Sequence, residues 1–471
     1  MSQGQPCGTP FIRNREEMGM NRIPCLRTFL FGFCAFACVS DVTGSQLVKV
    51  VDSFTPVAGE PPGTTFNLTV AAAAYKNGIF VFEAQVGGVK GLWRTGPTAG
   101  GFTRLVDVNT AIPSGSGFFR DLLPFRFDGS TLVFRGDDQG EFGGQAGYYA
   151  IPIGGGAITT LANQNTLVPP ANTTPFGFGI GFPGGTQDYM SLDGGNLVFA
   201  DNAESGNYAI DLASGQVRAI GTTAYAICEA GPYLALIWGQ PEISGNTVSM
   251  SIGGGQGSSL YTFPLSGVSG VPDPCATPRE RASNGSRIAS LNVANPGGGN
   301  FDAFKFGTQR ISGNTVVFRG GNASGRYGIY STASDGSGLS ELVSTNDAVP
   351  GGVGTFQDPV FGFSLELFVL GNEVVVFRGT DANLFQGVYA VPIQGGPVVE
   401  VTRAGDILPD GRTVYAAGGA ALAPEVFQGD SMYGDRLALR IDFTDPVLGF
   451  GSGIYTIDLG DLIFADDFEL P

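Results

Sequence analysis

A short two-strand pattern repeats along most of this 471-residue chain and sets the strongest limit on its fold. Each copy has an apolar strand and then, 9 to 16 residues further on, a second strand that carries Trp or Tyr. The first-strand anchors recur every 51 to 68 residues, at Phe82, Phe134, Phe199, Met250, Phe318, Phe377 and Leu439. The second-strand aromatics are Trp93, Tyr149, Tyr208, Tyr261, Tyr330, Tyr389 and Tyr455. Such a period indicates a repeat architecture, in which each unit buries its faces against its neighbours.

Two further strands complete each unit. A Phe-rich stretch precedes the pair, as at residues 123–127 and 361–363, and a Gly-Gly turn with an apolar strand follows it, as at 154–161 and 395–401. Hairpin turn signals separate the strands, and no long stretch has helical periodicity. We therefore predict an all-β chain that folds as a seven-bladed β-propeller of four-stranded blades. An open β-solenoid is the alternative.

The chain ends indicate how the ring closes. The predicted organisation is a leader and signal peptide over residues 1–44, a propeller over 45–460 and a tail over 461–471. Residues 47–51 resemble the fourth strand of a unit, whereas the last unit stops near its third strand. We expect the amino-terminal strand to complete the last blade, because closure removes the exposed edge of the array. Residues 462–464 are the competing candidate for that place.

The amino-terminal region has the order of a secretory signal. A basic stretch from Met20 leads into an apolar run at residues 28–39, and small and polar residues follow. The run is too short to span a bilayer, so we expect a secreted or periplasmic protein of bacterial type without a membrane span. A buried helix is the alternative for this run, and a lipoprotein acylated at Cys38 is the less favoured form of export.

Cleavage of the leader would leave two of the six cysteines, Cys228 and Cys275. Each lies where the sequence pattern places the beginning of a unit. An oxidising compartment favours a disulfide between them. Two separate thiols are the alternative.

The composition excludes several chemistries. The chain has no histidine, which removes Ser-His-Asp and Cys-His nucleophile systems and every His-ligated metal site. Its formal charge of −17 disfavours nucleic acid and anionic lipid as partners. Such a surface suits cations or basic partners, or it serves solubility alone.

Acidic residues gather in the loops of one predicted rim of the propeller. The candidates for a cation site are Asp137, Asp138, Asp201, Asp347, Asp381 and Asp406. Calcium is the one cofactor they suggest, because it takes several carboxylate and carbonyl oxygens. The commoner role of such residues is to cap turns by bonding their own backbone, and this interpretation is favoured.

Four arginines recur directly after the first-strand anchors, at Arg135, Arg319, Arg378 and Arg440. They would either form a ring for an anionic ligand or pair with acids in their own blades. We favour pairing within each blade.

Three segments carry resemblances to exported bacterial proteins. Residues 313–318, 328–330 and 346–352 resemble tandem repeats of the Asn-x-x-Gly-x-x-x-Ala-Phe type, and residues 329–343 resemble a TolB-like propeller repeat. Residues 463–469 are similar to the carboxyl-terminal endings of some exported bacterial proteins. The resemblance implies a propeller fold and export, and it carries no catalytic residues across.

The sequence leaves two classes of function open. The favoured one is an exported, non-enzymatic scaffold or binding module, monomeric, with a protein or polysaccharide partner. The alternative is a carboxylate-dependent carbohydrate-active enzyme, a glycoside hydrolase or lyase. Two carboxylates about 5–10 Å apart in a deep pocket would favour the enzyme. A shallow acidic rim would favour the binding module.

Overall fold

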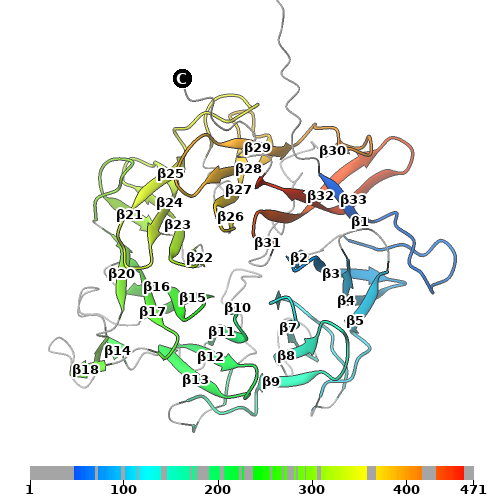
Figure 1. Ribbon diagram of the computed structural model, residues 1–471, viewed down its shortest axis with the longest axis horizontal. Coiled ribbons are helices and arrows are strands. Elements are labelled where there is room, and N and C mark those ends of the chain that lie inside the picture. The colour runs from blue at the N-terminus through cyan, green and yellow to red at the C-terminus, as the bar shows by residue number, and fades with distance from the viewer. Residues whose placement is uncertain are drawn as a thin grey trace, which may run out of the picture. The chain divides into compact units, whose positions relative to one another are not determined.

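Seven antiparallel sheets are arranged as blades in a ring (Figure 1). The computed structural model describes residues 47–68, 73–96, 101–113, 115, 117–138, 146–169, 172–173, 175–177, 190–201, 206–221, 225–226, 237–254, 257–267, 270–272, 280–282, 285–291, 293–304, 309–357, 368–415 and 431–460. All of them belong to the compact unit Gly44–Pro471. In these residues the regular elements are strands, and no helix is long and apolar enough to span a membrane. The predicted leader and tail, and the competing closing strand at 462–464, lie outside the described residues.

The first four blades follow one another along the chain, and in each the strand order runs from the ring axis outward. Blade 1 contains β2 (Ala73–Lys76), β3 (Ile79–Val86), β4 (Val89–Thr95) and β5 (Thr103–Asp107). Blade 2 contains β6 (Phe125–Phe127), β7 (Thr131–Gly136), β8 (Gly147–Pro152) and β9 (Thr159–Asn163). Blade 3 contains β10 (Met190–Asp193), β11 (Asn196–Asp201), β12 (Gly206–Asp211) and β13 (Val217–Gly221). Blade 4 contains β15 (Ile237–Ser244), β16 (Thr247–Gly254), β17 (Gly257–Pro264) and β20 (Ser286–Ser290).

The inner strand comes in two pieces in blades 5 and 7. Blade 5 contains β21 (Phe301–Phe304) and β22 (Arg310–Ser312), then β23 (Thr315–Asn322), β24 (Tyr327–Ala333) and β25 (Ser340–Ser344). Blade 6 contains β26 (Phe368–Leu370), β27 (Val374–Thr380), β28 (Gln386–Pro392) and β29 (Val399–Arg403). Blade 7 contains β30 (Thr413–Val414) and β31 (Met432–Tyr433), then β32 (Arg436–Asp445), β33 (Gly449–Asp458) and β1 (Val48–Asp52). The seven-bladed, all-β prediction is confirmed. Residues 361–363, expected to precede the strand pair of blade 6, lie outside the described residues, and the inner strand there is β26.

The amino-terminal strand closes the ring, as predicted. Strand β1 pairs antiparallel with β33, from Val48 opposite Thr456 to Asp52 opposite Gly453. Blade 7 therefore takes its outermost strand from the start of the described chain and its other strands from the end.

A small sheet that the sequence did not predict lies outside the blades. Strand β14 (Tyr225–Ala226) pairs parallel with β19 (Glu280–Ala282), which pairs antiparallel with β18 (Gly270–Pro272). Strands β18 and β19 are inserted between the third and fourth strands of blade 4. Cys275 lies outside the described residues, but its place in the sequence is between β18 and β19, and blade 5 begins only at β21. The expectation that Cys275 marks the beginning of a unit is therefore wrong.

The blades pack face to face through seven buried apolar clusters, which join each blade to the next and blade 7 to blade 1. In β7, Leu132 and Phe134 join the cluster shared with blade 1, whereas Val133 joins the cluster shared with blade 3. Strands buried on both faces read as near-continuous apolar runs, which explains the anchor sequences.

A third aromatic ring completes the predicted pair in several blades. The ring of Phe119, from the connection that enters blade 2, meets the rings of Phe134 and Tyr149 edge-on. Equivalent edge-on contacts to the blade Tyr recur at 4.9–5.1 Å between centroids, at Phe176–Tyr208, Phe301–Tyr330 and Phe356–Tyr389. Edge-on pairs at this distance are favourable, so each of these rings fastens the segment that carries it to the core of its blade.

Candidate binding surface

The connections between blades lie on the same rim as the loops between second and third strands. The N–H of Gln357, in the connection into blade 6, donates to the carbonyl of Thr380 at the end of β27 (2.9 Å). The N–H of Tyr415, in the connection into blade 7, donates to the carbonyl of Asp442 in β32 (2.9 Å). We call this edge of the ring the crossover rim. It carries the acidic residues singled out in the sequence.

Asp347 and Asp406 close the turns that leave the outer strands of blades 5 and 6. The Asp347 carboxylate accepts from the backbone N–H and the hydroxyl of Ser344 (2.6 and 3.2 Å). The Asp406 carboxylate accepts from the backbone N–H of Arg403 and the hydroxyl of Thr402 (2.7 and 3.3 Å). Both residues therefore have the turn-capping role that the sequence favoured.

Asp381 joins two loops of the crossover rim. It is buried, and one oxygen accepts from the N–H groups of Asn383 and Phe385 (2.8 and 2.9 Å). The other oxygen accepts from the N–H of Val353, in the connection that enters blade 6 (3.1 Å). This carboxylate fixes two loops against each other.

The other three cation-site candidates lie on blades 2 and 3. Asp137 is buried and directly follows β7, Asp138 is the next residue, and Asp201 ends β11. Burial, with the nearby Asp138 and Asp137 carboxylates, raises the pKa of Tyr149 to about 12. Across the part of the chain that the structure describes, no three Asp, Glu or Cys side chains are grouped to hold a metal ion. The cation site stays a prediction.

Three of the four recurring arginines are buried, and Arg135 is half-buried. Arg319, Arg378 and Arg440 are 1–6% exposed. Arg440 donates to Asp442 of its own blade (2.9 Å), and the guanidinium of Arg319 lies 4.9 Å from the ring centre of Tyr327, also in its own blade. Burial lowers the pKa of Arg378 to about 10. For Arg440, pairing within its own blade is confirmed.

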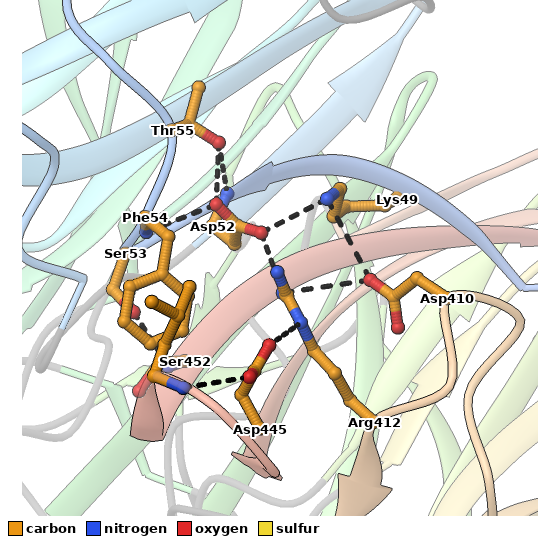
Figure 2. A network of polar contacts seen from close by, with 10 residues as sticks. Lys49, Asp52, Ser53, Phe54, Thr55, Asp410, Arg412, Asp445 and Ser452 are labelled. Atoms are coloured by element: carbon orange, nitrogen blue, oxygen red, sulfur yellow. Dashed lines mark hydrogen bonds and ion pairs between the residues drawn. The ribbon is translucent and has the colours of Figure 1, made fainter.

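A polar network joins the two ends of the propeller on the crossover rim (Figure 2). Arg412 donates to Asp52 at 2.6 Å and to Asp445 at 3.1 Å, and its guanidinium lies 3.5 Å from Asp410. Lys49 lies 3.1 Å from the same oxygen of Asp52. No sequence pattern pointed to this cluster, because its members come from three separate segments.

A polar groove of about 530 Å³ opens on the crossover rim at blade 5. Its walls are residues 297–300, 322–326 and 345–346, and none of them is acidic. The side chain of Asn322 donates to the carbonyl of Gly298 (2.8 Å) and accepts from the N–H groups of Ser324 and Arg326 (3.1 and 3.2 Å). The sequence did not single out this site.

The crossover rim also carries most of the exposed large apolar side chains of the described residues. Of eleven such side chains, nine lie there. Seven of these belong to blades 6 and 7 or to the connections that enter them: Val353, Leu384, Phe385, Ile407, Val447, Leu448 and Phe450. We call these seven residues the apolar rim patch.

The loops of the apolar rim patch contact one another. The N–H of Ala382 donates to the carbonyl of Val353 (2.9 Å), and the N–H of Ala404 donates to the carbonyl of Gln386 (3.0 Å). The ring of Phe450 packs edge-on against Tyr415 in the connection that enters blade 7, with 4.9 Å between centroids. The patch is therefore carried by neighbouring loops that are fixed to each other.

No protein-family model matches the sequence, and no curated protein matches it. Solved structures with a similar fold include TolB from Acinetobacter baumannii (9% identity, TM-score 0.35), where the match covers 70% of this chain and 64% of that chain. An uncharacterised protein from Listeria monocytogenes has 9% identity and a TM-score of 0.41, and the match covers 72% of this chain and 82% of that chain. An oligogalacturonate lyase from Vibrio parahaemolyticus has 10% identity and a TM-score of 0.42, and the match covers 88% of this chain and 99% of that chain. The match thus spans less than two thirds of the TolB chain. TolB-like propellers are thus among the structures that this chain resembles, and the Asn-x-x-Gly-x-x-x-Ala-Phe signature is not confirmed.

Proposed function

We propose that this chain is an exported, non-enzymatic β-propeller that binds a partner protein through the crossover rim of blades 6 and 7. The apolar rim patch is the observation that carries this proposal. Clustered, exposed apolar side chains on an otherwise polar surface are typical of protein interaction sites. Val447, the most exposed of them, is 86% accessible.

The patch is presented on preformed turns, which supports a binding role. The carboxylate of Asp445 accepts from the N–H groups of Val447 and Leu448 (2.8 and 2.9 Å), and these bonds lower its pKa below the usual range. Asp381 fixes Phe385 and Val353 in the same way. A surface that is already ordered loses little conformational entropy on binding.

The carboxylates of the crossover rim support a binding module over an acid-dependent enzyme. General acid and base catalysis on a sugar needs two carboxyl groups that face a substrate pocket. Asp347, Asp381 and Asp406 instead accept hydrogen bonds from turn N–H groups, and the blade 5 groove has no acidic wall residue. Export is part of the proposal because the amino-terminal signal pattern predicts it.

The test compares partners captured by the mature protein and by two variants. The double variant Phe385→Ser, Phe450→Ser removes two aromatic rings from the patch. Tyr433→Ser is the matched control, because Tyr433 is 45% exposed and precedes the turn between β31 and β32, on the other rim. Quantitative mass spectrometry of proteins retained from an envelope extract provides the readout.

Proteins retained by the native chain and by Tyr433→Ser should be lost with the double variant. Retention by the double variant at the native level would contradict the proposal. Equal loss with Tyr433→Ser would contradict it too, because binding would then not depend on the apolar rim patch.

A further inference from the structure

Blades 5 and 6 have equivalent loops on the crossover rim. Asn322 is the last residue of β23 in blade 5, and Asp381 directly follows β27 in blade 6. Each side chain accepts from the N–H groups two and four residues further on. Both loops therefore have the same backbone frame. Where the loops of blades 5 and 6 differ, the difference comes from their side chains and from the connection that packs on each loop.

The connection into blade 6 is fastened directly onto its loop. The carboxylate of Asp381 accepts from the N–H of Val353, and the N–H of Ala382 donates to the carbonyl of the same residue. In the connection into blade 5, the corresponding tip is the glycine run 297–299, and Asn322 reaches the carbonyl of Gly298. A Cβ on Gly298 or Gly299 would point into open space, and because neither residue has a side chain to fill this space, the groove of about 530 Å³ opens at blade 5.

The walls of the groove carry amide and hydroxyl groups. Asn300, Ser324, Thr345 and Asn346 line it, and Ala323 is the one wall residue with an apolar side chain. Amide side chains donate and accept hydrogen bonds, and hydroxyl groups do both as well. Such walls suit a ligand that is itself rich in hydroxyl groups, and they offer no large apolar surface.

The one charged wall residue, Arg326, already has an acidic partner. It forms an ion pair with Glu341, and it also donates to the Ser344 hydroxyl (3.2 Å) and to the carbonyl of Gly297. These bonds hold the guanidinium against the side of the groove and balance its charge. The site therefore has no unbalanced charge to favour an ionic ligand.

We infer that the blade 5 groove is a binding site for a neutral, polyhydroxylated ligand of the class of a short oligosaccharide. Its volume falls in the range of about 300–1,000 Å³ that is typical of small-molecule sites. The inference is independent of the proposed function, because the groove and the apolar rim patch share no residue.

The test measures binding of defined sugars by isothermal titration calorimetry. The probes are maltotriose, cellotriose, xylotriose and chitotriose, with trigalacturonate as the charged comparison. Ala323→Trp fills the groove from an exposed position, and Asn346→Ala removes one exposed amide. Asn383→Trp is the matched control, because it puts the same ring on the equivalent loop of blade 6.

At least one neutral trisaccharide should bind to the native protein. Ala323→Trp should weaken that binding at least tenfold and Asn346→Ala severalfold, whereas Asn383→Trp should leave it unchanged. The inference is overturned if no neutral trisaccharide binds or if Ala323→Trp binds like the native protein. It is also overturned if trigalacturonate binds as tightly as the best neutral sugar. The apolar patch variants should bind sugar normally, which separates this result from the test of protein binding.

Discussion

The guanidinium group of Arg412 lies 2.6 Å from the carboxylate of Asp52, a residue 360 positions earlier in the chain. The same guanidinium lies 4.4 Å from the ring centre of Phe443. It also donates to Asp445 at 3.1 Å (Figure 2). Backbone pairing of β1 with β33 closes the ring. Arg412 adds a side-chain bond between the connection into blade 7, the closing strand and the blade 7 hairpin.

Replacement of Arg412 should weaken ring closure. Asp52 is 2% exposed, so Arg412→Met leaves a buried carboxylate without its guanidinium partner. Breaking a buried pair in this way costs about 3–5 kcal/mol of unfolding free energy. Lys49→Met is the control and should cost under about 1 kcal/mol, because the Lys49 side chain is 36% exposed. Urea unfolding measures both, and equal losses would contradict the assigned role.

The stabilising effect of Asp52 should disappear in acid. Burial raises the pKa of Asp52, but hydrogen bonds from Thr55, Arg412 and Lys49 outweigh burial and hold the pKa below 3.8. A lowered pKa in the folded state gives stability that is present above the unfolded value and is lost as pH falls through the folded value. The difference in unfolding midpoint between the native protein and Arg412→Met should therefore have its largest value at pH 7 and be smaller near pH 3. A difference that does not change with pH would refute this linkage.

Six of the seven third strands have glycine two residues before the core Tyr or Trp, and blade 4 has Ser259 at this position. A Cβ placed on Gly147 would lie 2.6 Å from the carbonyl oxygen of Ala162 and 3.2 Å from the Tyr149 hydroxyl. Since the carbonyl belongs to the neighbouring strand, the sheet itself has to move, and we expect Gly147→Ala to cost about 1–3 kcal/mol. Gly154→Ala is the control, because no atom lies within 4 Å of its Cβ position. Thermal unfolding midpoints that are equal for the two variants would contradict the requirement for glycine at position 147.

Ionisation of two buried tyrosines should destabilise the fold at high pH. Burial, with nearby carboxylates, raises the pKa of Tyr149 and of Tyr330 to about 12, against an ordinary value of 10.0. A raised pKa in the folded state means that their contribution is complete below about pH 10 and is lost as pH rises through about 12. Tyr149→Phe should show a shallower loss of unfolding free energy between these pH values. A loss as steep as that of the native protein would rule out the assignment for Tyr149.

The sequence predicted what the repeat pattern encodes, and it missed what depends on contacts between segments. Phe134 and Tyr149 were identifiable because apolar strands buried on both faces impose one spacing on every blade. Phe119 was not, because it comes from a connection whose path depends on the finished ring. Asp381 was found as an acid on the rim, but its bond to the N–H of Val353 depends on two loops meeting in space. The blade 5 groove was missed for the same reason.

Cys228 and Cys275, which lie outside the described residues, should form a disulfide in the mature protein. The small sheet places Tyr225 opposite Glu280 and Ala226 opposite Arg281, so the segments that neighbour the two cysteines lie side by side. A disulfide needs Cα atoms within about 7 Å of each other, so the loops that carry the two cysteines would have to meet. Closing a loop of about 47 residues would stabilise the folded state by about 4 kcal/mol in the chain-entropy model. Mature protein from an oxidising compartment, denatured without reductant, should therefore react with no iodoacetamide, and reduction should lower its unfolding midpoint. Labelling of two cysteines per chain before reduction would establish two free thiols instead.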